Sequence, residues 1–127
     1  MKKEYNNQVE VVLDIIGGKW KSHIIYHLAS GPTRTGELKH LVTGITQKML
    51  IEQLKELETD GLINRKVFNQ VPPKVEYSLT DYGASLRDVL KVVCEWADEY
   101  VNYRYPAGEV SIKTKEHDVS PRSSSNS

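Results

Sequence analysis

The chain of 127 residues has little cysteine and no long hydrophobic run. Its single cysteine, Cys94, excludes an intramolecular disulfide and leaves a structural zinc knuckle without enough thiolate ligands. The two lysines near the start are followed by polar residues, so the apolar core of a signal peptide is missing. No apolar stretch approaches the roughly 20 residues that span a bilayer. We therefore expect a soluble, cytoplasmic protein with no membrane partner.

Motifs that indicate catalysis are also missing. The sequence has no glycine-rich phosphate loop, no carboxylate pair arranged for acid–base work and no recognisable nucleophile–base pair. His23 and His27 lie four residues apart and could bind one metal ion from a helix face, with His40 approaching in space. No cysteine or acidic cluster accompanies them in the sequence, so ordinary surface or half-buried histidines are the better interpretation. We predict a protein that is not an enzyme and has no cofactor and no metal.

The chain has no net charge, because seventeen basic and seventeen acidic residues cancel. Total charge therefore gives no hint of a nucleic-acid partner. The distribution is uneven: residues 17–74 hold nine Lys or Arg against five Asp or Glu, whereas residues 75–127 hold six against nine. A mildly basic middle suits a polyanion bound to that part of the chain.

The strongest helical pattern lies in the basic middle. Leu50, Leu54 and Leu57 recur at a spacing that places them on one helix face. Thr46 stands where an N-cap belongs, and Gly61 stands where a left-handed C-cap belongs. The opposite face is polar with one exposed apolar residue, and its members are Gln47, Lys48, Ile51, Glu52 and Lys55.

Three helices are expected before this one. The apolar period predicts a helix over residues 9–16, a second from Trp20 to the Gly31-Pro32 break, and a short third over residues 35–42. Thr35 is expected to cap the third helix, and Gly44 permits the tight turn that follows it. The first helix is apolar on two sides, which in a small domain is typical of contact with a second subunit.

A strand pair is expected after residue 61. Residues 62–68 and 74–79 alternate as strands do, and the connection between them contains Pro72 and Pro73. Arg65, Lys66 and Lys74 give this hairpin a basic edge. Such charges protect an edge strand from aggregation, and they also suit phosphate contact, so both interpretations stay open.

The last helix is expected over residues 80–101, with Thr80 as its cap and a length of about 33 Å. Its apolar stripe either closes the core of its own domain or pairs with a second copy of the chain, and we favour pairing. Beyond residue 105 the composition turns to Gly, Lys, Glu, Ser and Asn, which predicts a disordered tail over residues 106–127 after one domain over residues 1–105.

This order of elements is that of a helix-turn-helix with a wing. Particular segments resemble the HxlR family of bacterial transcription regulators, and the similarity runs from about residue 9 to residue 97. The run Val71-Pro72-Pro73-Lys74-Val75-Glu76-Tyr77-Ser78-Leu79-Thr80 is similar to the wing of that family and is the most specific segment. The others are residues 9–20, Gly31-Pro32, Glu37-Leu38, Ile45-Thr46, Leu50, Leu54, Leu57-Glu58 and Gly61-Leu62.

The resemblance implies a mainly α fold with a small β-hairpin, a winged helix-turn-helix whose long terminal helix dimerises. It implies a homodimer that binds double-stranded operator DNA and regulates transcription, which we expect to be repression. Base reading would involve Thr46, Gln47, Lys48 and Ile51, and phosphate contact would involve Arg34, Lys55, Arg65, Lys66 and Lys74. The dimer interface would involve Val9, Val12, Leu13, Leu86, Leu90, Val93, Trp96, Ala97 and Tyr100.

Two alternatives and one departure from the family's pattern accompany this reading. The fold alone would also suit a protein-docking module without operator binding. A small-molecule effector could bind in a cleft between the last helix and the DNA-binding part.

Many members of the family resemble one another in a sensor cysteine just before the first helix, where this chain has Asn7. We therefore predict that Cys94 has no redox role.

Overall fold

The structure is a computed structural model and describes residues 1–113. Its helices are α1 (Gln8–Ile16), α2 (Lys21–Leu28), α3 (Thr35–Leu41), α4 (Gln47–Thr59), α5 (Asp81–Ala84) and α6 (Leu86–Arg104). Its strands are β1 (Thr33–Arg34), β2 (Ile63–Phe68) and β3 (Lys74–Leu79). The predicted tail lies outside the described residues from residue 114 onward.

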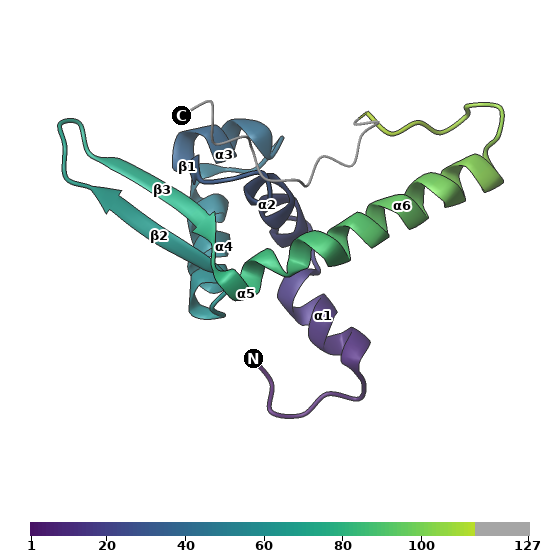
Figure 1. The fold of residues 1–127 in the computed structure, drawn as a ribbon, viewed down its shortest axis with the longest axis horizontal. Helices are drawn as coiled ribbons and strands as arrows, with labels where there is room; N and C mark the ends of the chain where they lie inside the picture. Colours follow the sequence, from purple (N-terminus) through teal and green to yellow (C-terminus); the bar gives the residue numbers. More distant parts are fainter. Residues whose placement is uncertain (114–127) are drawn as a thin grey trace.

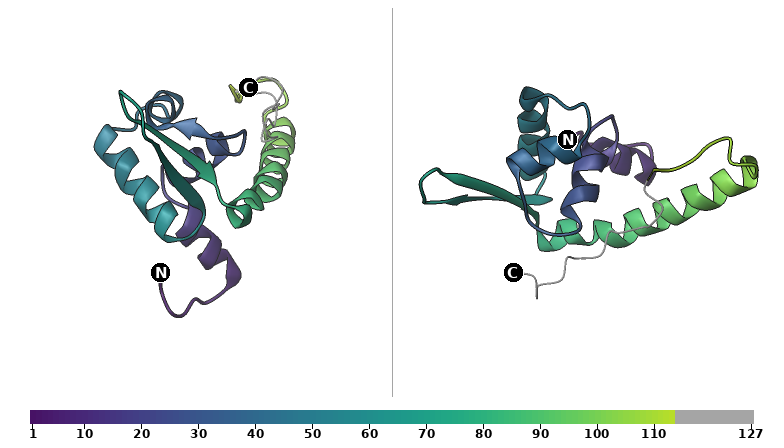
Figure 2. Two further views of the ribbon diagram at one scale, coloured as in Figure 1. Left: turned by 60° about the vertical axis from the view of Figure 1, so that its left-hand side comes forward. Right: turned by 90° about the horizontal axis from the view of Figure 1, so that it is seen from above.

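The helices form a central body from which two long elements extend in opposite directions (Figures 1 and 2). One is the wing, which consists of β2, β3 and the connection over residues 69–73. The other is α6, which continues well past the body. The predicted mainly α fold with a small sheet and a long terminal helix is confirmed. None of the helices within residues 1–113 is long and apolar enough to cross a membrane.

The core lies where α2, α3 and α4 meet. The leucines predicted to be the inner face of α4 are fully buried, and Ile24, Ile25, Leu28 and Leu38 complete the same cluster. Ile63 and Tyr77 join the sheet to it. Burying each such aliphatic side chain stabilises the fold by about 1.5–3 kcal/mol, which is why this spacing fixes the helical body.

The predicted ends of α4 are confirmed. The Thr46 hydroxyl accepts a hydrogen bond from the Met49 amide at 3.1 Å, so one otherwise unpaired N–H is satisfied. Gly61 follows the helix with φ +78°, a left-handed conformation that a side chain would oppose. Ile51 was expected to be exposed, but the structure places it half-buried.

The sheet has one strand more than predicted. β1 pairs antiparallel with β3, so the order is β1-β3-β2. Two residues are too few to show an alternating pattern, which is why no pattern in the sequence predicts β1. The pairing places Thr33 opposite Tyr77, and both are buried. Near the helical body, β3 is therefore paired on both of its sides, with β1 on one side and β2 on the other.

Two further expectations were wrong. Arg34, not Thr35, occupies the N-cap position of α3, and no side chain caps that helix. The last helix is divided into α5 and α6 at Ser85. Thr80 does cap α5, since its hydroxyl accepts from the Gly83 amide at 2.9 Å and donates to the Gly61 carbonyl at 2.8 Å. These bonds tie the single turn of α5 to the end of α4, and the long helix begins only after it.

Candidate nucleic-acid interface

The first turn of α4 stands free at the surface of the body. Thr46, Gln47 and Lys48 are exposed, and the turn before them contains Gly44 at φ +89°. Ile51 is half-buried on the next turn, and Lys55 is exposed one turn further. An exposed helix start with amide and ammonium donors matches the part of a recognition helix that reaches base edges. The structure therefore leaves three of the four predicted base readers accessible, and their role stays a prediction.

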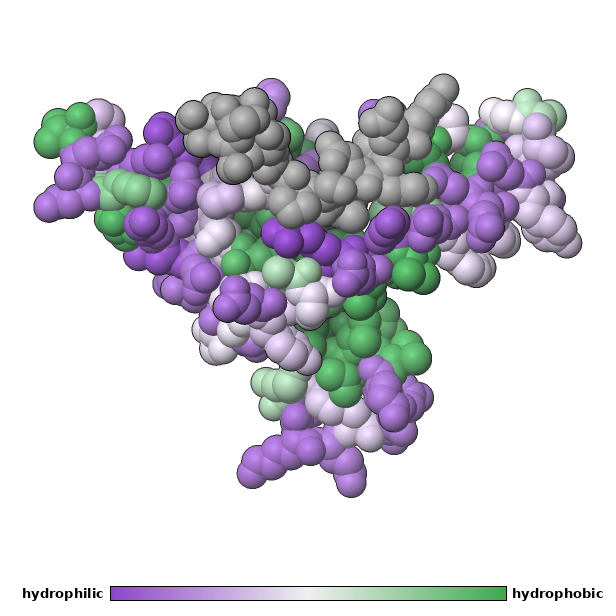
Figure 3. Space-filling view, in the orientation of Figure 1, coloured by the Kyte–Doolittle hydropathy of each residue, from purple (hydrophilic) through white to green (hydrophobic). Residues whose placement is uncertain are grey.

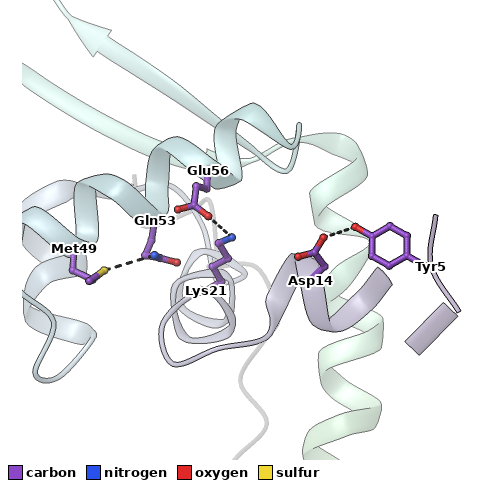
Figure 4. A network of polar contacts seen from close by, with 6 residues as sticks. All are labelled: Tyr5, Asp14, Lys21, Met49, Gln53 and Glu56. Atoms are coloured by element: carbon purple, nitrogen blue, oxygen red, sulfur yellow. Dashed lines mark hydrogen bonds and ion pairs between the residues drawn. The ribbon is translucent and has the colours of Figure 1, made fainter. Parts of the chain in front are cut away.

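An ion pair joins α2 to α4. Lys21 Nζ lies 2.7 Å from Glu56 Oε1, and the two side chains point toward each other (Figure 4). The Lys21 side chain is only 14% exposed, whereas that of Glu56 is 55% exposed. No local sequence pattern predicts this pair, because its residues are 35 positions apart.

We expect a double-mutant cycle with Lys21→Met and Glu56→Gln to give a coupling energy of about 0.5–1 kcal/mol for unfolding. The value is modest because water reaches the glutamate and screens the pair. Urea denaturation of the four proteins measures it, and the coupling should fall in high salt. A coupling near zero at low salt would mean that the pair contributes nothing to the placement of α4.

Basic side chains gather on one face of the sheet. Strand register sets Arg34 and Lys66 on either side of Glu76, and it sets Phe68 opposite Lys74. Side chains that are directly opposite share a face, so these five residues form one surface, which we call the basic sheet face. Three cations against one carboxylate leave it with a net charge of about +2.

Two cations of the basic sheet face, Lys66 and Lys74, make contacts with other residues of that face. The ammonium groups of Lys66 and Lys74 lie 4.8 and 4.2 Å from the centroid of the Phe68 ring. Lys74 also lies 3.6 Å from a Glu76 oxygen, and its side chain is only 21% exposed. Lys66 is exposed. Of these two lysines, Lys66 is therefore the one more available to an outside anion.

Arg65 lies on the other face of the hairpin. It pairs with buried Tyr77, and the alternation that points Ile63 into the core points Arg65 to the same side. The predicted phosphate-contacting residues thus divide between two faces, so a single flat contact does not engage them all. Sequence reasoning missed this division because it treated the hairpin charges as one edge.

A hollow of about 310 Å³ joins the wing to the start of α3. Arg34, Gly36, Gln70, Pro73 and Lys74 are among its lining residues. The hollow places two of the predicted phosphate-contacting cations at its walls. It extends the basic sheet face from the sheet toward the helix-turn-helix.

Apolar side chains are exposed on α1 and α6. Val9 and Leu13 of α1 are 63% and 59% exposed, and Figure 3 shows apolar surface gathered over this helix and the adjoining part of α6. Six large apolar side chains of α6 are exposed, and four of them recur at helical spacing and form a band that we call the apolar stripe: Val89, Val93, Trp96 and Tyr100. Val92 and Tyr103 are the other two. Exposed apolar area on this scale is typical of protein contact.

Two residues predicted for the dimer interface pack within or against the core of the chain itself. Leu90 is 6% exposed within the core cluster, and Leu86 packs against that cluster. Both are on the side of α6 that meets the core. Residues on both sides of α6 satisfy the helical period. The stripe predicted from the sequence therefore combined a core side of the helix with an outer side. Val12 is also exposed, and Ala97 is half-buried.

The histidines do not assemble with other ligands. His23 is exposed and His27 is half-buried on α2, and His40 is exposed on α3. Within residues 1–113, no three His, Cys, Asp or Glu side chains are close enough together to hold a metal ion.

Comparison with known proteins gives consistent matches. The HxlR-like helix-turn-helix family matches residues 15–105. The uncharacterized HTH-type transcriptional regulator YtcD of Bacillus subtilis is 57% identical over 104 residues, which cover 82% of each chain. A crystal structure of a ytcD regulator matches with a TM-score of 0.72 and 55% identity, covering 76% of this chain and 98% of that one. The redox regulator HypR in its reduced form matches with a TM-score of 0.73 and 44% identity over 79% of this chain and 99% of its own.

Proposed function

Because this chain belongs to the HxlR-like helix-turn-helix family, we propose that it is a DNA-binding transcriptional regulator that acts as a homodimer on operator DNA. The exposed first turn of α4 carries this proposal, since it offers polar donors at an accessible helix start. The basic sheet face of the same chain adds cations that suit phosphate contact. We propose repression as the outcome, with the bound dimer excluding other proteins from promoter DNA.

In this proposal the first turn of α4 enters the major groove. Lys48 would donate to guanine acceptors and Gln47 would pair with adenine, while Ile51 would contact a thymine methyl group at the rim of the core. Thr46 stays engaged as the N-cap, so its hydroxyl contributes to helix geometry as well as to the groove surface. The basic sheet face would contact phosphates and fix the register without reading sequence.

Two copies would be held by the apolar faces of α1 and α6. A two-fold dimer places two recognition helices on half-sites about one helical turn of DNA apart. The apolar stripe supports this arrangement because Val93 and Trp96 are 53% and 64% exposed in the single chain. Trp96 and Tyr100 are stacked with ring centroids 5.2 Å apart, so the stripe presents an ordered aromatic surface to the second copy.

Selection from random duplexes followed by a salt series tests the proposal. We expect one sequence to be enriched, and we expect the logarithm of its affinity to fall by about 0.9 per phosphate contact as the logarithm of salt concentration rises. A reporter with that sequence at its promoter should be expressed more strongly when the regulator is absent. No duplex enriched, or an affinity that ignores salt, would contradict operator binding and favour the protein-docking module.

The redox function in the name of HypR does not extend to this chain in our proposal. Asn7, which stands where family members resemble one another in a cysteine, is the N-cap of α1 and accepts a hydrogen bond from the Glu10 amide at 3.0 Å. Burial, and then the carboxylates of Asp98 and Glu95, raise the pKa of the Cys94 thiol. Little thiolate is therefore present at neutral pH, and the thiolate is the reactive form.

We expect iodoacetamide to modify Cys94 in the native protein more slowly than in the urea-unfolded protein at neutral pH. The rate profile of the native protein should be displaced to higher pH, because its thiol ionises later. Mild oxidant should leave DNA affinity unchanged in the wild type and in Cys94→Ser. A reversible loss of affinity in the wild type alone would show that Cys94 senses oxidants.

A further inference from the structure

A groove of about 520 Å³ separates α2 from α6 and reaches the turn before α4. Its walls are mostly apolar or aromatic side chains, among them Tyr26, Leu41, Leu90, Cys94 and Ala97. Ile112 closes part of the remaining side. This size and lining match those of sites for small organic molecules, which combine an apolar wall with a few polar groups.

The polar groups of the groove indicate what it would accept. Burial, and then the neighbouring His23, lower the pKa of half-buried His27, so its imidazole is largely neutral at physiological pH and offers one donor and one acceptor. The Tyr26 ring meets the imidazole edge-on, with centroids 5.3 Å apart and an interplanar angle of 81°. Asp98 and Lys113 also line the groove, and their opposite charges cancel. Ser22, His23 and Thr43 also line the groove. The groove is therefore suited to a flat, uncharged molecule, and the half-buried imidazole of His27, in ring contact with Tyr26, is the polar group that we pair with its hydrogen-bonding group.

We propose that this groove is a regulatory site for a small aromatic molecule that carries a single neutral hydroxyl group. The ring would lie among Tyr26, Leu90 and Ala97, and the hydroxyl would bond to the imidazole of His27. Regulation of DNA binding by this site rests on the function proposed above. The binding of the molecule itself does not.

The position of the groove explains how a ligand would act on DNA affinity. Its walls come from α2, which the Lys21–Glu56 pair ties to the recognition helix, and from α6, which carries the apolar stripe on its outer side. A ligand that contacts both helices favours one placement of the DNA-binding body relative to the dimer helix. The ligand raises operator affinity if operator binding needs the placement that the ligand favours, and it lowers operator affinity if operator binding needs another placement. The operator changes the affinity for the ligand by the same coupling free energy.

Titration calorimetry with 2-naphthol tests the site, and 2-naphthoate serves as the charged ligand of matched shape. We expect saturable binding of 2-naphthol and weaker binding of 2-naphthoate. Cys94→Trp should fill the groove and weaken the affinity by about tenfold or more, since the ring then competes with the ligand for space. Glu95→Trp, which adds the same side chain at an exposed neighbour outside the lining, should leave the affinity unchanged. His27→Leu should weaken it about fivefold, the effect of one lost hydrogen bond.

Each outcome decides the proposal. Absence of saturable binding, equal affinity in wild type and His27→Leu, or tighter binding of 2-naphthoate would overturn it. His27→Leu also decides the case if Cys94→Trp fails to fold in a thermal melt. Operator affinity is then measured with and without saturating 2-naphthol, and an unchanged value overturns the regulatory role. If the protein binds no DNA at all, the proposed function fails, whereas the calorimetry still decides the groove.

Discussion

Val93→Asp should convert the protein to a monomer and lower its operator affinity by about 100-fold or more. Val93 lies within the apolar stripe and is 53% exposed in the single chain, so the substitution leaves the core of the monomer intact. In the proposed dimer the new carboxylate would be buried without a partner in both copies, at a cost of several kcal/mol each. A monomer then reaches only one half-site at a time and loses the joint contact that the second half-site provides.

Sedimentation at micromolar concentration measures the mass, and circular dichroism confirms that the variant is folded. Asn102→Asp is the matched control, because it places the same carboxylate at an exposed position of α6 outside the stripe. Leu90→Asp is the contrasting case: Leu90 is 6% exposed in the core, so that variant should unfold instead of dissociating. A folded Val93→Asp dimer with unchanged operator affinity would show that the apolar stripe is not part of the dimer interface.

The parts of the fold that the sequence predicted are those set by local rules. The inner leucines of α4 follow the helical period, and Thr46 and Gly61 mark its ends through their own backbone preferences. The wing followed in the same way from alternation around two prolines. These signals are contained within a few residues of chain, so no knowledge of distant contacts was needed.

The parts that the sequence did not predict depend on pairing between distant segments. Strand β1 exists because Thr33 and Arg34 meet β3, and only that register brings Arg34 beside Glu76. The division of Arg65 from Lys66 likewise follows from which side of the hairpin faces the core. A helical stripe read from sequence could not separate Leu90 from Val93, because both satisfy the same period and differ only in what lies opposite.

These placements sharpen the expected roles of the candidate DNA contacts. Lys48 is exposed on the first turn of α4, where a side chain reaches base edges. Lys66 and Lys74 belong to the basic sheet face, but Lys74 already lies 3.6 Å from a Glu76 oxygen. A cation that is partly neutralised within the protein releases less counterion from DNA than a free one. The three lysines should therefore differ in both the size and the kind of their effect.

We expect Lys48→Ala to lower operator affinity by about 1–3 kcal/mol and to relax the preference at one base pair in each half-site. Lys66→Ala should weaken operator and scrambled duplexes alike and reduce the salt slope by about one unit, and Lys74→Ala should do the same to a smaller extent. Competition of each variant against both duplexes over a salt series measures these effects. Equal weakening of both duplexes by Lys48→Ala, together with altered base preference in Lys66→Ala, would reverse the assignment. Unchanged binding in all three variants would place the DNA surface elsewhere on the molecule.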